Sequence, residues 1–165
     1  MGYGCAGETP VSELDRPQVS PLVLTLPEPP SANRWWRSAR GRVFLSHEAR
    51  DYKQDAFLRA GIKDKTLFPT EPISVIVVWH RNDKRGDLDK RLGVVLDALQ
   101  SIFKRVPDPK PGKPKNKKWV LLAPGVYDDD DQIVQLWARR CDEHKDIPKG
   151  SVRIEIAPCV ETATP

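Results

Sequence analysis

Two successive apolar patterns constrain the fold of this sequence more than any other feature. Residues 73–79 are β-branched or otherwise apolar at nearly every position, which predicts a central strand with both faces buried. Residues 88–104 carry apolar side chains at helical spacing, which predicts an amphipathic helix. The positions in this stripe are Leu88, Leu92, Val95, Leu96, Leu99 and Phe103.

Shorter patterns complete the predicted fold. A second helix is expected over 47–60, with Ser46 as its N-cap and Gly61 at its end. Further strands are expected at 22–26, 42–45, 119–122, 132–138 and 151–156. We expect 132–138 to be covered at least partly on both faces, and 151–156 to be an edge strand with Val152, Ile154 and Ile156 inward. The prediction is an α+β fold, with a small mixed sheet of about four strands flanked by two main helices.

Length and composition favour one domain. The chain has 165 residues, 39% of them hydrophobic, which suits a single compact core. We expect a disordered tail over 1–20, a domain over 21–157 and a second tail over 158–165. Within the domain, 104–124 is predicted to be an inserted loop rich in proline and lysine. No apolar run approaches 18 residues, no secretory signal is apparent, and three scattered cysteines form no disulfide framework, so a cytoplasmic location with no membrane contact is expected.

Acidic side chains gather in two places. Asp87 and Asp89 lie between the predicted central strand and the long helix, and the run 128–131 consists of four aspartates. Crowded carboxylates raise one another's pKa, and a cation between them relieves the repulsion. Because Mg²⁺ prefers oxygen ligands, both clusters together predict a magnesium site for chemistry on a phosphate.

Basic and aromatic residues point to a polyanionic partner. Residues 31–37 are predicted to be a loop in which Arg34 and Arg37 flank Trp35 and Trp36, a combination suited to stacking on bases and holding phosphates. Residues 104–118 hold seven lysines and arginines against one acid and are predicted to form an extended loop. Two plainer interpretations stay open: the tryptophans pack the loop onto the core, and the basic loop is merely solvated.

Five segments in order resemble one known family. They are residues 26–33, 41–46, 87–89, 97–99 and 127–132. With them the chain resembles the RusA family of Holliday junction resolvases over about 22–156. The resemblance implies a homodimeric α+β endonuclease that uses Mg²⁺ to cut four-way DNA junctions, in a bacterial or phage setting at the nucleoid. One or two ions are expected, with Mn²⁺ as a substitute and no organic cofactor.

The resemblance also assigns residues. It implies Asp87, Asp89 and Asp130 as metal ligands and catalytic acids. Two positions depart from the family: Lys90 stands where asparagine is common, and Gly93 stands where the family has a catalytic lysine. Lys90 is our preferred replacement for that cation. The DNA-binding residues expected are Arg34, Trp35, Trp36, Arg37, Arg81, Lys84, Arg85, Arg91, Lys113, Lys115, Lys117 and Lys118.

Two other functions fit parts of the pattern. The missing lysine allows a protein that binds junctions but cleaves them weakly or not at all. An Asp-x-Asp after a buried strand also occurs in nucleotide-sugar transferases that hold Mn²⁺ and a diphosphate. The short chain, the basic loop and the second acidic cluster argue against the transferase.

Overall fold

The computed structural model describes residues 20–82, 86–107, 117–141 and 147–159. The elements in chain order are β1 (Leu22–Pro27), α1 (Ala32–Trp35), β2 (Trp36–Ala39), β3 (Arg42–Leu45), α2 (His47–Arg59), β4 (Ile73–His80), α3 (Leu88–Leu99), β5 (Ile102–Pro107), β6 (Lys117–Ala123), the 3₁₀ turn η2 (Asp130–Gln132), β7 (Ile133–Cys141) and β8 (Ser151–Pro158).

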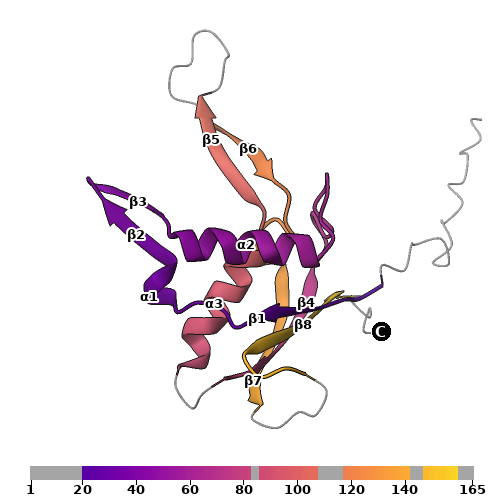
Figure 1. The fold of residues 1–165 in the computed structure, drawn as a ribbon. Helices are drawn as coiled ribbons and strands as arrows, with labels where there is room; N and C mark the ends of the chain where they lie inside the picture. Colours follow the sequence, from indigo (N-terminus) through magenta and orange to yellow (C-terminus); the bar gives the residue numbers. More distant parts are fainter. Residues whose placement is uncertain (1–19, 83–85, 108–116, 142–146, 160–165) are drawn as a thin grey trace, which may run out of the picture.

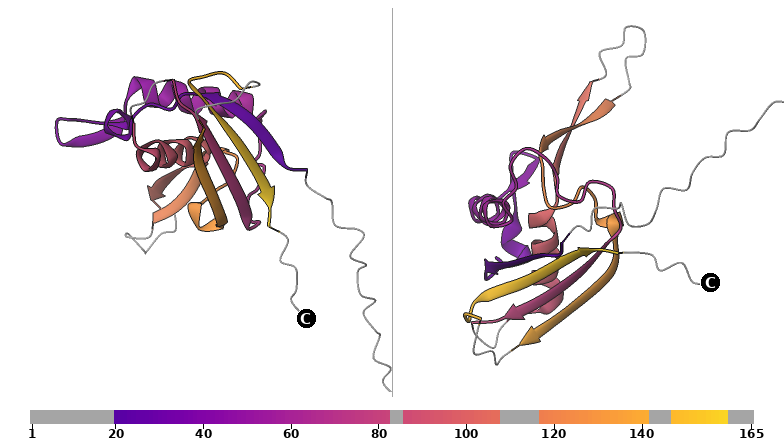
Figure 2. Two further views of the ribbon diagram at one scale, coloured as in Figure 1. Left: turned by 90° about the horizontal axis from the view of Figure 1, so that it is seen from below. Right: turned by 90° about the vertical axis from the view of Figure 1, so that its right-hand side faces the viewer.

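A mixed sheet of four strands, in the order β1-β8-β4-β7, forms the centre of the fold (Figure 1). Strand β4 pairs antiparallel with β8 and parallel with β7, so it lies inside the sheet as its composition predicts. Helices α2 and α3 pack against one face of this sheet (Figure 2). The predicted α+β class, with four strands and two main helices, is confirmed; the short helix α1 is an addition.

The hydrophobic core lies between the sheet and these two helices. Ile154 and Ile156 of β8 have no exposed surface, and neither does Leu99 of α3. Helix α2 contributes Ala49 and Ala56, also without exposed surface, and their small side chains allow the helix to approach closely. Within the part of the chain that the structure describes, no helix is long and apolar enough to cross a membrane.

Two strand predictions were wrong about position in the sheet. Strand β8 lies between β1 and β4 instead of at an edge, and its alternating pattern arises because only one of its faces is covered by helices. Strand β7 forms the edge, and it is largely exposed rather than covered on both faces. Its Leu136 is 46% exposed and its Trp137 is 54% exposed.

Helix α3 is shorter than the apolar stripe predicts. It ends at Leu99, because Gln100 adopts extended backbone angles (φ −73°, ψ 143°), so Phe103 belongs to strand β5. Residues 102–107 and 117–123 pair as an antiparallel ribbon, whereas the sequence predicted an extended loop through 118. Residues 31–37 likewise form α1 and the start of a second ribbon, β2–β3, in place of a loop. Both ribbons project from the body of the molecule (Figure 1).

Candidate active site

The first predicted acid begins helix α3. Asp87 occupies the N-cap position with extended backbone, but its carboxylate does not cap the helix. Instead it accepts a hydrogen bond of 2.7 Å from the Lys90 ammonium. This bond and the charge of Lys90 lower the pKa of the Asp87 carboxyl, and the same contact raises the pKa of Lys90. Lys90 therefore contacts the first acidic motif and compensates the charge of Asp87.

Three polar or small positions follow one another along α3. Asp89, Gly93 and Asp97 are spaced four residues apart, so they lie on one stripe of the helix surface. A Cβ atom added at Gly93 would meet no atom within 4 Å. Gly93, which stands where the RusA family has lysine, thus faces open space.

The second acidic motif is held against the end of α3 by backbone contacts. Val126 N–H donates to the Leu99 carbonyl at 2.7 Å, and Ser101 N–H donates to the Tyr127 carbonyl at 2.8 Å. Gly125 makes this approach possible, since an added Cβ there would lie only 2.4–2.6 Å from the backbone of residues 99–101. The segment before the aspartate run is consequently fixed to the helix terminus.

Replacing Gly125 with alanine should destabilise the fold. The methyl group would overlap rigid backbone, so one of the two segments must shift, at a cost of about 2–3 kcal/mol. Urea unfolding monitored by tryptophan fluorescence would measure the loss. Gly93→Ala is the matched control, because its added methyl meets nothing within 4 Å and alanine favours the helix. Equal stabilities of the two variants would contradict this account of Gly125.

The four aspartates have different surroundings. Asp128 accepts a hydrogen bond of 2.8 Å from the Thr66 hydroxyl, and Asp129 is the N-cap of η2, in a capping box with Gln132. The Gln132 amide also donates to the Phe68 carbonyl at 2.9 Å. Asp128 and Asp129 are therefore occupied in shaping the turn, while Asp131 is exposed.

Asp130 turns toward α3. The Tyr127 hydroxyl lies 2.9 Å from the Leu96 carbonyl and 3.2 Å from Asp130 Oδ1, so it links the carboxylate to the helix. The pKa of Asp97 is raised, first by burial and then by the charge of Asp130. Asp97 and Asp130 thus form an acidic pair in which two carboxylates repel each other.

A buried lysine lies beside this acidic pair. Lys53 of α2 is only 8% exposed, and its ammonium donates to the Asp97 carbonyl and, at 2.7 Å, to the Gln100 carbonyl. Burial lowers the pKa of Lys53 to about 8, although the charges of Asp97 and Asp130 act in the opposite direction. Sequence reasoning missed Lys53, although its position four residues after the buried Ala49 was a usable signal.

The acids form two pairs at different points of α3: Asp87 and Asp89 at its start, and Asp97 with Asp130 near its end. Asp97 is eight residues beyond Asp89, about 12 Å along the helix axis. Within the described ranges, no three acidic, histidine or cysteine side chains lie close enough to hold one metal ion, so Asp87, Asp89 and Asp130 do not form a single cluster. The donor chemistry nevertheless fits a hard cation. Repulsion between Asp97 and Asp130 marks where positive charge would be stabilised, whereas Asp87 would first have to release Lys90.

Comparison with known proteins finds sequences similar to part of this chain. No family model matches the chain. The curated RusA crossover junction endodeoxyribonucleases of Enterobacteria phage 82, Shigella sonnei (strain Ss046) and Escherichia coli (strain K12) are each 34% identical to it over 79 residues. Over this segment the chain is similar to RusA. The match takes in 46% of this chain and 64% of each relative, less than two thirds of their length.

The chain has two tryptophans where DNA contacts were predicted, and they differ in exposure. Trp35 is 2% exposed and packs edge-on against Tyr52, with the ring centroids 6.3 Å apart. The DNA contact predicted for Trp35 is therefore wrong, because its ring is part of the core. Trp36 is 53% exposed on β2, where Arg37 is also exposed, and both stay predicted DNA contacts.

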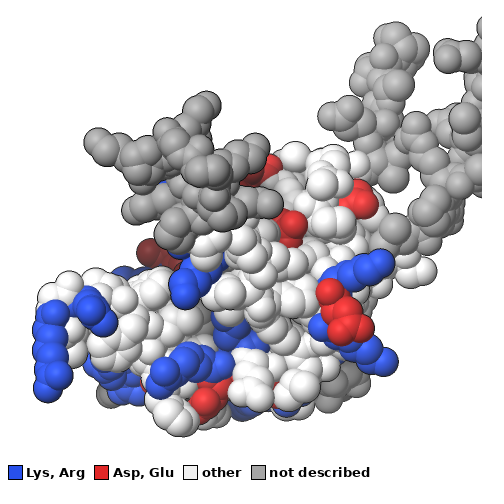
Figure 3. All heavy atoms as spheres, turned by 90° about the horizontal axis from the view of Figure 1, so that it is seen from above, with Lys and Arg blue, Asp and Glu red and all other residues white. Residues whose placement is uncertain are grey.

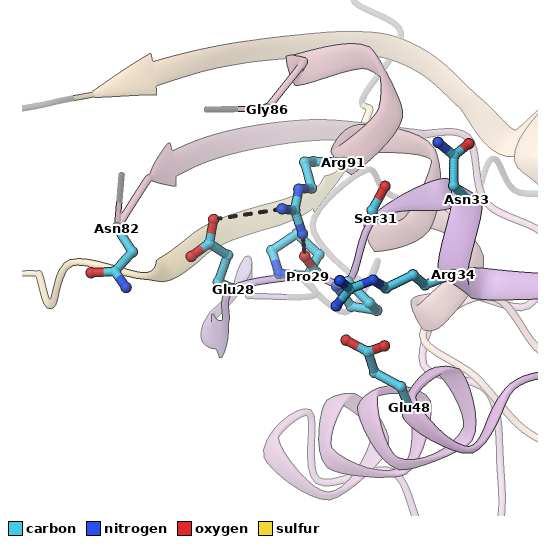
Figure 4. Close-up of a pocket in the computed structure, with 10 residues that line it drawn as sticks. Glu28, Pro29, Ser31, Asn33, Arg34, Glu48, Asn82, Gly86 and Arg91 are labelled. Atoms are coloured by element: carbon cyan, nitrogen blue, oxygen red, sulfur yellow. Dashed lines mark hydrogen bonds and ion pairs between the residues drawn. The ribbon is translucent and has the colours of Figure 1, made fainter. Parts of the chain in front are cut away.

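Two predicted arginines line a cleft of about 570 Å³ beside the start of α3 (Figure 4). Arg91 is turned inward, where it donates to the Pro29 carbonyl and lies 4.0 Å from Glu28. It therefore ties the segment after β1 to α3, which leaves it less suited to hold DNA. Arg34 is exposed at the other side of the cleft, near Glu48.

The remaining predicted contacts are only partly described. Arg81 follows β4 and is half-buried. Lys84, Arg85, Lys113 and Lys115 lie outside the described residues; Lys117 and Lys118 belong to β6, but their side chains are not described. Figure 3 shows lysine and arginine side chains gathered at its left and lower edges, the left being the side where the β2–β3 ribbon lies in Figure 1.

Proposed function

We propose that this protein is a structure-specific endodeoxyribonuclease that resolves four-way (Holliday) DNA junctions by paired phosphodiester hydrolysis in recombination and repair. Its setting would be the nucleoid of a bacterial or phage-infected cell. The observation that carries the proposal is that Asp130 lies beside Asp97, a residue of the same helix α3 that Asp87 begins. The relatives of the chain are named crossover junction endodeoxyribonucleases.

The proposed cofactor is Mg²⁺, as one or two ions, with Mn²⁺ as a substitute. Asp87, Asp89 and Asp130 would hold it, and the position of Asp97 adds a fourth carboxylate. When bound, the metal would lower the pKa of an attacking water and stabilise the leaving oxygen. Two acidic pairs, Asp87 with Asp89 and Asp97 with Asp130, suit two ions better than one.

The side chains around these acids would prepare the site. Tyr127 holds Asp130 in place, so the carboxylate needs little rearrangement before it binds a cation. Lys90 neutralises Asp87 in the free protein. If Asp87 held a metal ion instead, the Lys90 ammonium would be free to contact a phosphate oxygen, which is the electrostatic role of the family lysine.

A second candidate is junction binding without cleavage. The specific observation in its favour is that the lysine position is Gly93, which faces open space, while Lys90 is engaged with Asp87. The basic and aromatic surfaces would still serve such a protein.

One assay separates the two candidates. An end-labelled synthetic four-way junction and a linear duplex of equal length are incubated with the protein, with and without Mg²⁺ or Mn²⁺. Symmetric nicks in two opposing strands of the junction alone would support the nuclease. Tight junction binding with no cut at any metal concentration would leave only the binding protein.

We also propose that the protein acts as a homodimer, since two equivalent sites suit paired nicks. The surface that supports this is the edge strand β7, where Val134, Leu136 and Trp137 are 55%, 46% and 54% exposed. A long apolar edge strand left open in a monomer is prone to pair with another chain. The partner surface would therefore include β7.

Replacing Leu136 with lysine should convert the dimer to a monomer. The buried charge would oppose pairing at the β7 edge, and dissociation at about 10 µM protein is expected. Sedimentation-velocity ultracentrifugation would measure the mass. Leu58→Lys is the control, because Leu58 is 70% exposed on α2. A Leu136→Lys protein that sediments like the unaltered dimer would place the interface elsewhere, and an unaltered monomer would end the dimer proposal.

A further inference from the structure

The β5–β6 ribbon exposes large apolar side chains that its own structure does not use. Its Trp119 is 61% exposed and its Leu122 is 60% exposed. The ribbon projects away from the sheet (Figure 2), so no other described element covers these groups. Because a two-stranded ribbon has no interior, an exposed tryptophan there is available to a partner.

One face of the ribbon combines aromatic and cationic groups. The register pairs Phe103 with Leu121 and Arg105 with Trp119, so these four side chains share a face. The Arg105 guanidinium lies 5.4 Å from the centre of the Trp119 ring. The opposite face carries Lys104 and Val120, without an aromatic ring. The two faces therefore differ in what they can bind.

The charge of the β5–β6 segment indicates which class of partner would bind it. Residues 102–123 contain seven lysines and arginines and a single acid, Asp108. A second copy of the ribbon would be repelled by this charge, whereas a polyanion would be attracted. A tryptophan ring beside an arginine suits nucleic acid in particular, because bases stack on the ring while the cation holds a phosphate. Stacking requires base faces that are free, and an intact duplex hides them within its own stack.

We propose that the face formed by Phe103, Arg105, Trp119 and Leu121 binds unpaired nucleobases, with a base stacked on the Trp119 ring. Unpaired bases at a branch point or on a single-stranded segment are the expected ligands. The inference rests on the proposed function for its biological substrate, but the binding itself requires neither metal nor cleavage. Of the two tryptophans that sequence analysis singled out for stacking, Trp35 is buried and Trp36 is exposed on β2; Trp119 is a third candidate, on a different element.

Fluorescence anisotropy with a labelled 15-nucleotide oligothymidine, in EDTA, tests the proposal. Trp119→Ala should raise the Kd for the single strand about tenfold, while Trp119→Phe should stay within about threefold of the unaltered protein, since phenylalanine also stacks. Val120→Ala is the matched control, because Val120 is exposed on the opposite face, and it should change the Kd less than twofold. Arg105→Ala should reduce the slope of log K against log salt concentration by about 0.7, the share of one phosphate contact.

Two further ligands complete the design. A blunt duplex of 15 base pairs should lose little affinity in Trp119→Ala, because it presents no free base faces except at its ends. Phosphatidylglycerol vesicles test whether the face recognises an anionic lipid surface instead. Unchanged single-strand binding by Trp119→Ala, an equal loss for duplex, or a preference for vesicles would each overturn the proposal. Because no ligand here is a junction and no metal is present, the result does not depend on nuclease activity.

Discussion

Replacing Asp130 with asparagine should lower the rate of junction cleavage by about 100-fold or more while leaving junction binding within about threefold. Asparagine keeps the size of the side chain but removes the charge that would hold the metal, and 100-fold corresponds to about 2.7 kcal/mol of transition-state stabilisation. Single-turnover cleavage of a labelled junction in Mg²⁺, with a gel-shift assay in Ca²⁺ or EDTA, would separate the two effects.

The neighbouring aspartate provides the control for this experiment. Asp131 is exposed and carries the same charge, yet no side-chain contact ties its carboxylate to α3 among the interactions of the described residues. Asp131→Asn should therefore cut within about threefold of the unaltered rate. Normal cutting by Asp130→Asn, or an equal loss in both variants, would mean that the wrong aspartate of the run has been assigned.

Replacing Lys53 with methionine should lower the free energy of unfolding by about 2 kcal/mol at pH 7. Methionine fills a similar volume but donates no hydrogen bond, so the Asp97 and Gln100 carbonyls at the end of α3 would lose their shared donor. Urea unfolding monitored by circular dichroism would measure the change. Arg59→Met on the same helix is the control, since Arg59 is exposed and its ion pair with Asp55 contributes little.

The effect of the Lys53→Met substitution should also grow with pH. The pKa of Lys53 is about 8 in the folded protein and 10.5 as the ordinary value, so between these limits the unfolded chain binds more protons. Burial of the Lys53 charge destabilises the folded state below pH 8. This penalty disappears as the pH rises toward 10.5, which raises the free energy of unfolding by about 3 kcal/mol at most. The stability difference between the unaltered protein and Lys53→Met should therefore increase from pH 7 to pH 10. A difference that stays constant would show that Lys53 does not titrate in this range.

Local patterns were sufficient wherever a segment's own residues decide its structure. The β-branched run at 73–79 became the interior strand β4, because a strand apolar on both faces is stable only between neighbours. Ser46 caps α2 by accepting a hydrogen bond of 3.0 Å from the Ala49 N–H, as its position before the helical pattern predicts. Helix α3 begins at Leu88, within the Asp-x-Asp motif, as that motif predicts.

Local sequence patterns failed to predict the structure of segments that depend on contacts with residues distant in the chain. The apolar stripe continues to Phe103, but α3 ends at Leu99 because the chain there turns to meet residues 125–127. The exposure of Trp35 and Trp36 could not be predicted from sequence, because adjacent side chains point in different directions. Trp35 is buried by tertiary packing in the core, where its ring contacts Tyr52. The sequence pattern of β7 could not reveal that this strand lies at the edge of the described sheet, with a neighbouring strand along one edge only.

By itself, the sequence determined which residues could do chemistry: two acidic motifs, their order around one helix, and the resemblance to the RusA family that the comparisons bear out. These depend on residue type and spacing, which folding does not alter. Only the tertiary structure decided which acid meets which. Packing of Gly125 against the end of α3 brings Asp130 to Asp97 and away from Asp89, and packing of α2 delivers Lys53 to the same place. Such contacts join residues 24 or more positions apart, and no periodicity in the chain encodes them.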